Sequence, residues 1–321
     1  MKDTSQRKRQ LLVLVGPTAV GKTKLSLTLA KEYNAEIISG DSMQVYRGMD
    51  IGTAKASAEE LALVPHHMID IHDPDHPFSV AEFQERSTAL IEEISGRGRL
   101  PFIVGGTGLY VESVCYDYRF SESGSDEAFR EEQQAYADTY GPEALHERLR
   151  AVDPASADRL HANDVRRVIR ALEIFHVTGE RWSDQLGAQR HRESPYELCI
   201  IGLTMDRALL YKRIEERIDT MMRQGLLEEV RGLLERGYDG AVVSMQALGY
   251  KEIVGHLQGR YSLEEAVELL KRDTRRFAKR QLSWFRHMKD IAWVDVSNLA
   301  EFSTHLDKIR DIISAKLTLD R

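Results

Sequence analysis

The chain has 321 residues, of which 42% are hydrophobic and 30% are charged, so it is long enough for an α/β core and a second, smaller domain. Its formal net charge of −7 excludes nucleic-acid binding by bulk charge, and such binding would need a local basic patch. No stretch reaches membrane-spanning length, and the two cysteines, Cys115 and Cys199, lack metal-ligand spacing. We therefore expect a cytoplasmic protein without membrane contact.

The first predicted element is a buried strand, Leu11–Val15, which runs into a glycine-rich turn. Gly16, four further residues and then Gly21-Lys22-Thr23 have the spacing of a nucleotide-type phosphate-binding loop. Glycines let backbone N–H groups converge on phosphate oxygens, and the helix predicted over Lys22–Tyr33 adds the positive end of its dipole. Lys22 supplies a mobile charge, and the Thr23 hydroxyl suits a Mg²⁺ ion that bridges two phosphates. The candidate residues for binding a diphosphate or triphosphate are Gly16, Pro17, Thr18, Ala19, Val20, Gly21, Lys22 and Thr23.

A second strand is predicted over Ala35–Ser39, and Asp41 follows it. Ligands of open parallel sheets lie beyond the carboxyl ends of the strands, so Asp41 should face the phosphate-binding loop. The segment Asp41–Lys55 has neither helical nor strand periodicity and is rich in hydrogen-bonding side chains, which favours a substrate-binding loop.

Four histidines with aspartates nearby occupy residues 66–76. Their spacing matches no compact zinc signature. We predict a strand over Met68–Ile71, with the histidines at its ends and in the following loop rather than in a metal site.

A helix predicted over Val80–Ser95 leads to a strand over Leu100–Val104 and to a second glycine turn, Gly105–Gly108. Three glycines in one turn favour a close approach of the backbone to a ligand over a packing turn alone. A helix is expected over Tyr110–Tyr116. None of these strands ends in the acidic pair of a mechanical ATPase, which disfavours a motor protein.

The region from about Arg119 to Ser194 has dense charge and predominantly helical patterns, including Pro142–Arg150 and Asp164–Thr178, so we predict a helical insertion. Arg166, Arg167 and Arg170 lie on its second helix, and Glu173 is the first acidic residue after them. A solvated arginine face and a contact with an anion or a phosphate backbone are equally compatible with this pattern.

The sheet resumes with a strand over Leu198–Leu203, followed by a helix over Arg207–Gln224. Arg213 and Arg217 are four residues apart on this helix and share a face. A glycine-punctuated polar loop, Ser244–Glu252, enters another helix.

A long helix is predicted over Leu263–Arg286, capped by Ser262 with Glu265. From Lys271 to Arg286 it carries seven basic residues against one acid, Asp273, and its end adds aromatic surface, which favours binding of a polyanion. The basic residues are Lys271, Arg272, Arg275, Arg276, Lys279, Arg280 and Arg286. A strand over Ile291–Val294 and a final helix complete the core.

Three features need one explanation: the phosphate-binding loop, the carboxylate of Asp41 and the basic helices. A kinase for a small metabolite would explain the first two, and phosphoryl transfer would identify it. A non-catalytic RNA-binding module would retain RNA affinity after loss of Lys22 and Asp41. An enzyme that acts on a nucleic acid with a diphosphate co-substrate explains all three.

Several motifs, in the same order along the chain, resemble the tRNA dimethylallyltransferases, also called tRNA isopentenyltransferases, in their compact bacterial form. The motifs are residues 16–23, 41–46, 50–55, 105–110, 166–173, 249–252 and 279–286. The resemblance implies an α/β fold with a P-loop NTPase-like parallel sheet flanked by helices, and a helical insertion domain. The expected domains are a core of residues 1–118 and 197–321 and a tRNA-contacting insertion of residues 119–196.

The resemblance implies transfer of a dimethylallyl group from dimethylallyl diphosphate to the exocyclic amine of the adenosine 3′ of the anticodon, in tRNAs that read codons beginning with U. It implies a Mg²⁺ cofactor held by Thr23, the tRNA anticodon stem-loop as partner, and a monomer without stable protein partners. The candidate catalytic residues are Asp41 as general base, Thr107 and Arg217. The candidate tRNA-binding residues are Asp41, Ser42, Met43, Gln44, Thr107, Arg130, Arg166, Arg167, Val168, Ile169, Arg170, Arg276 and Arg280.

Overall fold

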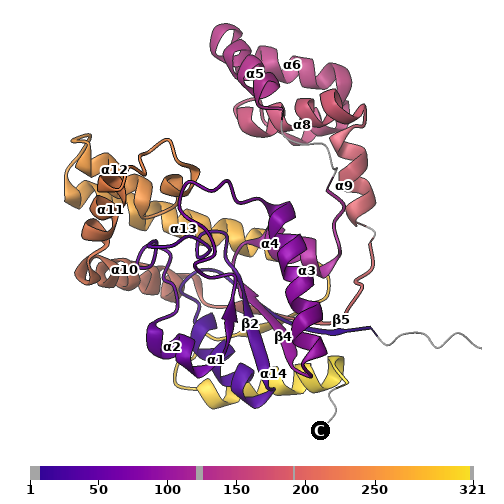
Figure 1. Ribbon diagram of the computed structural model, residues 1–321, viewed down its shortest axis with the longest axis vertical. Coiled ribbons are helices and arrows are strands. Elements are labelled where there is room, and N and C mark those ends of the chain that lie inside the picture. The colour runs from indigo at the N-terminus through magenta and orange to yellow at the C-terminus, as the bar shows by residue number, and fades with distance from the viewer. Residues whose placement is uncertain (1–7, 121–125, 191, 319–321) are drawn as a thin grey trace, which may run out of the picture. The chain divides into compact units, whose positions relative to one another are not determined.

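A computed structural model describes residues 8–120, 126–190 and 192–318. Its described residues divide into two compact units, one from Met1–Cys115 and Ser194–Arg321 and one from Tyr116–Glu193. Figure 1 shows the elements of both units.

The first unit is built on a six-stranded sheet with the order β3-β2-β4-β1-β5-β6. All the neighbouring strands run parallel, which confirms the predicted parallel sheet. Its strands are β1 (Gln10–Val15), β2 (Ala35–Gly40), β3 (His66–His67), β4 (Leu100–Gly105), β5 (Glu197–Thr204) and β6 (Ile291–Asp295). Strand β1 lies between β4 and β5, and Leu11 to Val15 are fully buried, as expected for a strand covered on both faces.

Helices pack on this sheet, among them α1 and α3 against β4, and α14 against β5 and β6 (Figure 1). The helices of the unit are α1 (Lys22–Glu32), α2 (Ala58–Leu63), α3 (Val80–Gly96), α4 (Gly108–Cys115), α10 (Arg207–Gln224), α11 (Leu226–Glu235), α12 (Tyr250–Leu257), α13 (Leu263–His287) and α14 (Phe302–Lys316), with a short 3-10 helix, η1 (Val243–Gln246). The described chain contains no helix that is both long and apolar enough to cross a bilayer.

Local sequence signals fix several helix ends. Ser262 and Glu265 form the predicted capping box of α13, and α10 has the predicted bounds Arg207–Gln224, with Gly225 in the left-handed conformation after it.

The strand predicted over Met68–Ile71 is wrong. Strand β3 comprises only His66 and His67, because Met68 and Asp70 have positive φ angles of 63° and 54°. Such backbone angles are incompatible with an extended strand. The chain beyond β3 instead forms a loop that bridges Tyr46 at His72.

The second unit is helical and has its own hydrophobic core, which includes Leu145, Leu149, Val168 and Leu172. Its helices are α5 (Glu127–Tyr140), α6 (Pro142–Val152), α7 (Pro154–Arg159), α8 (Val165–Thr178) and α9 (Trp182–Arg190). Pro142 begins α6 and Gly179 ends α8, as the sequence predicts for a helix start and stop.

Candidate functional site

The phosphate-binding loop joins the carboxyl end of β1 to the start of α1. Gly21, with φ of 106°, precedes the first residue of α1, and Ala19 also has a positive φ of 64°. The Lys22 ammonium donates hydrogen bonds of 2.9 Å to the backbone oxygens of Gly16 and Pro17. The loop thus wraps around its own lysine, the arrangement expected of a phosphate-binding loop.

A cavity of about 480 Å³ opens beside this loop. Four cationic side chains, Lys22, Lys24, Arg213 and Arg217, line it together with the Thr23 side chain. Arg213 is fixed by a hydrogen bond of 2.8 Å from its Nε to the backbone oxygen of Ala19. Converging cations and a helix N-terminus make this cavity suited to a polyphosphate.

Asp41 lies directly after β2 and lines the same cavity. Its Oδ1 accepts a hydrogen bond of 2.9 Å from the Met43 backbone N–H. Burial raises the pKa of Asp41 above its ordinary value, while the charges of Lys22 and Arg217 oppose that rise. Asp41 is therefore a stronger base than an exposed aspartate.

Asp41 shares this cavity with a second carboxylate, that of Glu60. Glu60 belongs to the capping box of α2, and its Oε2 accepts a hydrogen bond of 2.9 Å from the Ser57 N–H. The two carboxylates therefore differ, since Glu60 is engaged in capping a helix.

Burial also changes the acidity of the cations. It lowers the pKa of Lys22 to about 8, with a further contribution from the charge of Arg217. Burial likewise lowers the pKa of Arg217. Both groups are destabilised in their charged forms, and an arriving anion would relieve this cost.

A second, less polar cavity adjoins the first, and both are lined by Asp41 and Arg217. Apolar side chains of this second cavity include Ile214, Ile218 and Met221 of α10. The predicted site residues Ser42, Met43, Thr107 and Arg280 line it as well. Asp41 and Arg217 thus stand between a cationic cavity and a partly apolar one.

Thr107 connects the two strand ends. Its Oγ1 accepts a hydrogen bond of 3.1 Å from the Ser42 N–H, so the turn after β4 is tied to the turn after β2. Gln44 lines the first cavity, and its Oε1 accepts a hydrogen bond of 2.8 Å from the Ser39 hydroxyl.

Gln281 of α13 is a functional candidate that the sequence did not single out. Its Oε1 accepts a hydrogen bond of 2.9 Å from the Thr18 N–H, and its Nε2 donates one of 2.9 Å to the Gly106 oxygen. One buried amide therefore holds the phosphate-binding loop against the second glycine turn. Only its place within the basic stretch of α13 could have suggested this role.

Glu229 of α11 was also missed. Its carboxylate accepts hydrogen bonds from the N–H groups of Asp50, Ile51 and Gly52 at 2.8–3.1 Å and from the Tyr250 hydroxyl at 2.7 Å. These bonds hold the predicted substrate loop in place. Thr53, the residue of this loop that follows Gly52, lines both cavities. No local sequence pattern predicts such a contact between segments far apart in the sequence.

In the helical insertion, the candidate tRNA-binding residues fall into two groups. Val168 and Ile169 are 0% and 6% exposed, so their side chains form the core of this unit, and only the arginines remain candidates for direct contact with RNA. Arg170 pairs with the buried Glu173 at 2.6 Å, and Arg130 pairs with it at 2.8 Å.

Arg166 and Arg167 are exposed on α8. Arg167 pairs with Asp164 at 3.1 Å. Arg166 has no ion pair within the described part of the chain.

Ion pairs neutralise more of the positive charge of helix α13 than its own sequence suggests. Lys271 pairs with Asp219 and Arg275 with Glu215, both acids of α10, while Arg272 and Arg276 share Asp273. The basic residues of α13 without an ion pair to another described residue are Lys279, Arg280 and Arg286. The free positive charge is therefore concentrated in the second half of the helix.

Comparison with known protein families gives two matches. The model described as IPP transferase matches residues 44–288, and that described as Isopentenyl transferase matches residues 9–72. Among curated relatives, a tRNA dimethylallyltransferase of Geobacillus thermodenitrificans is 54% identical over 312 residues, 97% of this chain and 98% of the relative. One of Bacillus cereus is 57% identical over 292 residues, 91% of this chain and 92% of the relative.

Solved structures agree with these matches. A tRNA isopentenylpyrophosphate transferase from Bacillus halodurans is 50% identical and covers 96% of this chain and 97% of its own, with a TM-score of 0.73. A eukaryotic dimethylallyltransferase, described as acting on tRNA, is 29% identical and covers 97% of this chain and 82% of its own, with a TM-score of 0.80.

Proposed function

Because this chain belongs to the tRNA dimethylallyltransferase family, and is thus a transferase, we propose that it transfers a dimethylallyl group from its diphosphate to the exocyclic amine of the adenosine immediately 3′ of the anticodon. The proposed substrates are tRNAs that read codons beginning with U, and the proposed site of action is the cytoplasm, as a monomer. The observation that supports this most directly is the position of Asp41, which lines both the cationic cavity and the partly apolar one.

The cationic cavity suits the diphosphate of the donor. Breaking the allylic carbon–oxygen bond leaves negative charge on the departing diphosphate. Lys22, Arg213 and Arg217 line the cavity and would stabilise that charge together with the N–H groups of the phosphate-binding loop. Arg217 lines both cavities, so it is best placed to stabilise the negative charge that develops on the diphosphate as the bond breaks.

The partly apolar cavity suits the acceptor adenine and the five-carbon group. An adenine amine is a poor nucleophile because its lone pair is delocalised into the ring. Asp41 would accept the amine proton as the carbon–nitrogen bond forms, and its raised pKa helps in this role. The adenosine would leave the anticodon-loop stack to enter the cavity, passing Ser42 and Thr107, which line it.

A Mg²⁺ ion fits the first cavity. The exposed Thr23 side chain follows Lys22 at the start of α1 and lines the cavity, and an oxygen ligand of this kind suits Mg²⁺ when phosphates and water supply the other ligands. Thr23 would hold the ion. Bound there, Mg²⁺ would neutralise part of the diphosphate charge.

Two groups of arginines are proposed to bind the tRNA backbone. One lies on the insertion and includes Arg130, Arg166, Arg167 and Arg170, and the other lies on α13 and includes Arg276 and Arg280. Phosphate contacts by arginine position an RNA without reading its sequence. The choice of tRNA would then come from the bases admitted to the second cavity.

The proposed function is tested by incubating the protein with labelled dimethylallyl diphosphate, Mg²⁺ and unmodified tRNA, followed by nucleoside analysis. Label should appear on the adenosine 3′ of the anticodon in U-reading tRNAs. Transfer of a phosphoryl group from added ATP to a small metabolite, without labelled tRNA, would support a kinase instead, and tRNA binding without product would support a binding module.

A further inference from the structure

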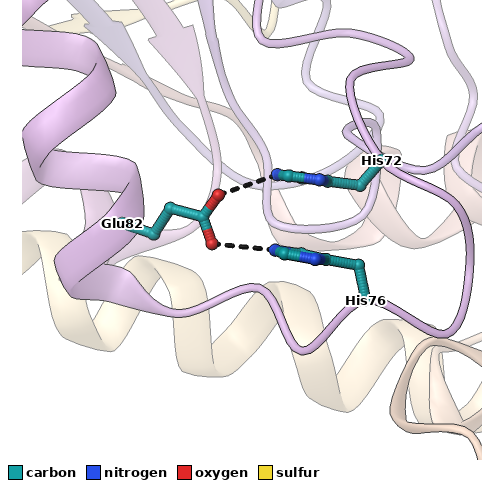
Figure 2. Close-up of side chains that lie close together, drawn as sticks. All are labelled: His72, His76 and Glu82. Carbon is teal, nitrogen blue, oxygen red and sulfur yellow. Dashed lines mark hydrogen bonds and ion pairs between the residues drawn. The ribbon is translucent and has the colours of Figure 1, made fainter.

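A cluster of two histidines and a glutamate lies apart from the residues that line the two cavities. His72 and His76 belong to the loop between β3 and α3, and Glu82 lies in the first turn of α3 (Figure 2). The imidazole rings stack with their centroids 3.6 Å apart and 5° between their planes. His72 Nε2 lies 2.9 Å from Glu82 Oε1, and His76 Nε2 lies 3.0 Å from Oε2. Three potential ligand atoms therefore gather within 4.8 Å of one another.

We propose that this cluster binds one divalent transition-metal ion of the zinc class. Two imidazole nitrogens and one carboxylate form a donor set that suits Zn²⁺. The default prediction from the sequence, in which these histidines are only loop residues, missed Glu82 because helix α3 brings it to the pair.

The geometry requires a small adjustment. Zinc–ligand distances of about 2.0–2.2 Å place tetrahedral ligand atoms about 3.3 Å apart, so each nitrogen–oxygen contact has to open by a few tenths of an ångström. The stacked rings also have to tilt, since the lone pairs of parallel rings do not meet at one point. The His76 side chain is 38% exposed and has room to do so.

The fourth coordination position has access to solvent. A surface hollow next to the cluster is lined by Arg47, Ile71, His72, Asp73, Asp75 and His76. The hollow gives an ion a route to the site and leaves space for a water ligand or an aspartate oxygen. Three protein ligands with one open position is a common zinc arrangement.

Neighbouring cations do not block the site. Arg86 Nε donates to Glu82 Oε1 at 2.8 Å, but its side chain is 47% exposed, and such a surface pair on one helix is weak and easily exchanged. Arg47 is turned to Asp73, at 3.3 Å, and to the Ile71 backbone oxygen.

A bound ion would join the histidine loop to α3. The loop is already bonded to the segment that follows Asp41: the His72 N–H donates to the Val45 oxygen at 2.9 Å, and the Arg47 N–H donates to the His72 oxygen at 2.8 Å. Gln44 of that segment lines the first cavity. The ion would therefore stiffen one wall of the cavity without taking part in the reaction.

The test is a titration of the full-length, chelator-treated protein with Co²⁺, followed by visible absorption, and then displacement by Zn²⁺. We expect one ion per chain and a melting temperature that rises until one equivalent of Zn²⁺ is bound. His76→Ala and Glu82→Gln should each weaken binding by at least about 10- to 100-fold, since even residues behind the ligands have effects of that size. Arg86→Gln should strengthen it.

His161→Ala, which removes an exposed histidine of the insertion, serves as the matched control and should bind as the parent protein does. Circular dichroism checks the folding of each variant, and Glu82→Gln keeps the side-chain volume if His76→Ala fails to fold. Absence of Co²⁺ and Zn²⁺ uptake by the parent protein, or undiminished uptake by folded Glu82→Gln, would overturn the proposal.

Discussion

Asp41 is the residue whose chemistry the proposed transfer needs most directly. Asp41→Asn keeps the size of the side chain and its acceptor for the Met43 N–H, but it removes the proposed general base. We expect single-turnover transfer to slow by about 100- to 10,000-fold, with tRNA affinity nearly unchanged. Glu60→Gln, which alters the other carboxylate of the cavity, is the control and should retain the rate within a factor of a few. If the two variants lost the same factor in single-turnover rate, Asp41 would not differ from Glu60 in its effect on transfer, and its assignment as the general base would be wrong.

Lys22 gives the donor site a pH dependence. Its pKa of about 8 in the folded protein means that it is charged below that pH and neutral above it. In the proposed function the charged form of Lys22 holds the diphosphate, so donor affinity of the free enzyme should fall as the pH rises through about 8. Lys22→Arg, whose side chain stays charged, should abolish this fall. Donor dissociation constants measured across this range for both proteins provide the check, and parallel profiles would show that another group titrates.

The residues that surround a site are less predictable than its central residues. The spacing of Gly16 to Thr23 predicts a phosphate-binding loop, because that geometry is built from consecutive residues. Gln281 and Glu229 were not identified, since each acts on backbone groups of segments far away in the sequence.

At the scale of elements, the loop around Asp50 depends on α11 for its shape. Glu229→Ala removes the acceptor of three N–H groups and of the Tyr250 hydroxyl. A buried donor left without a partner, here the hydroxyl of Tyr250, costs about 1–3 kcal/mol, so the free energy of unfolding should fall by that order, and kcat/KM should fall with it. Denaturant unfolding and steady-state kinetics measure the two effects. The neighbouring exposed Glu228→Ala should change neither.

Helix ends were predictable where capping residues mark them, as Ser262 and Glu265 do for α13. Strand β3 was placed two residues late, because alternating apolar residues suggested Met68–Ile71 and nothing local revealed the positive φ at Met68. The charge of α13 was overestimated for a similar reason, since the acids that neutralise Lys271 and Arg275 come from α10.

At the scale of the whole molecule, the basic end of α13 is expected to bind the tRNA backbone. Each phosphate contact contributes about 0.7–0.9 to the slope of log affinity against log salt. Arg276→Glu with Arg280→Glu should therefore weaken tRNA binding and reduce the slope by about 1.4–1.8, while donor affinity changes little. Lys31→Glu with Lys308→Glu introduces the same change in charge on α1 and α14. If both double variants behave alike, only net charge matters and the RNA docks elsewhere.

The position of β1 in the sheet has a consequence for folding during synthesis on the ribosome. Strand β1 pairs with β4 on one side, but its partner on the other side, β5, lies 187 residues further along the chain, beyond the insertion. At about 5–20 residues per second, β5 is synthesised about 10–40 s after β1. Once β4 has been made and until β5 follows, β1 would be the open edge of a half-built sheet, and its five apolar residues, which are buried in the folded protein, would be accessible to other nascent chains. Chaperone binding to stalled nascent chains should therefore be strongest when the insertion has emerged and β5 has not.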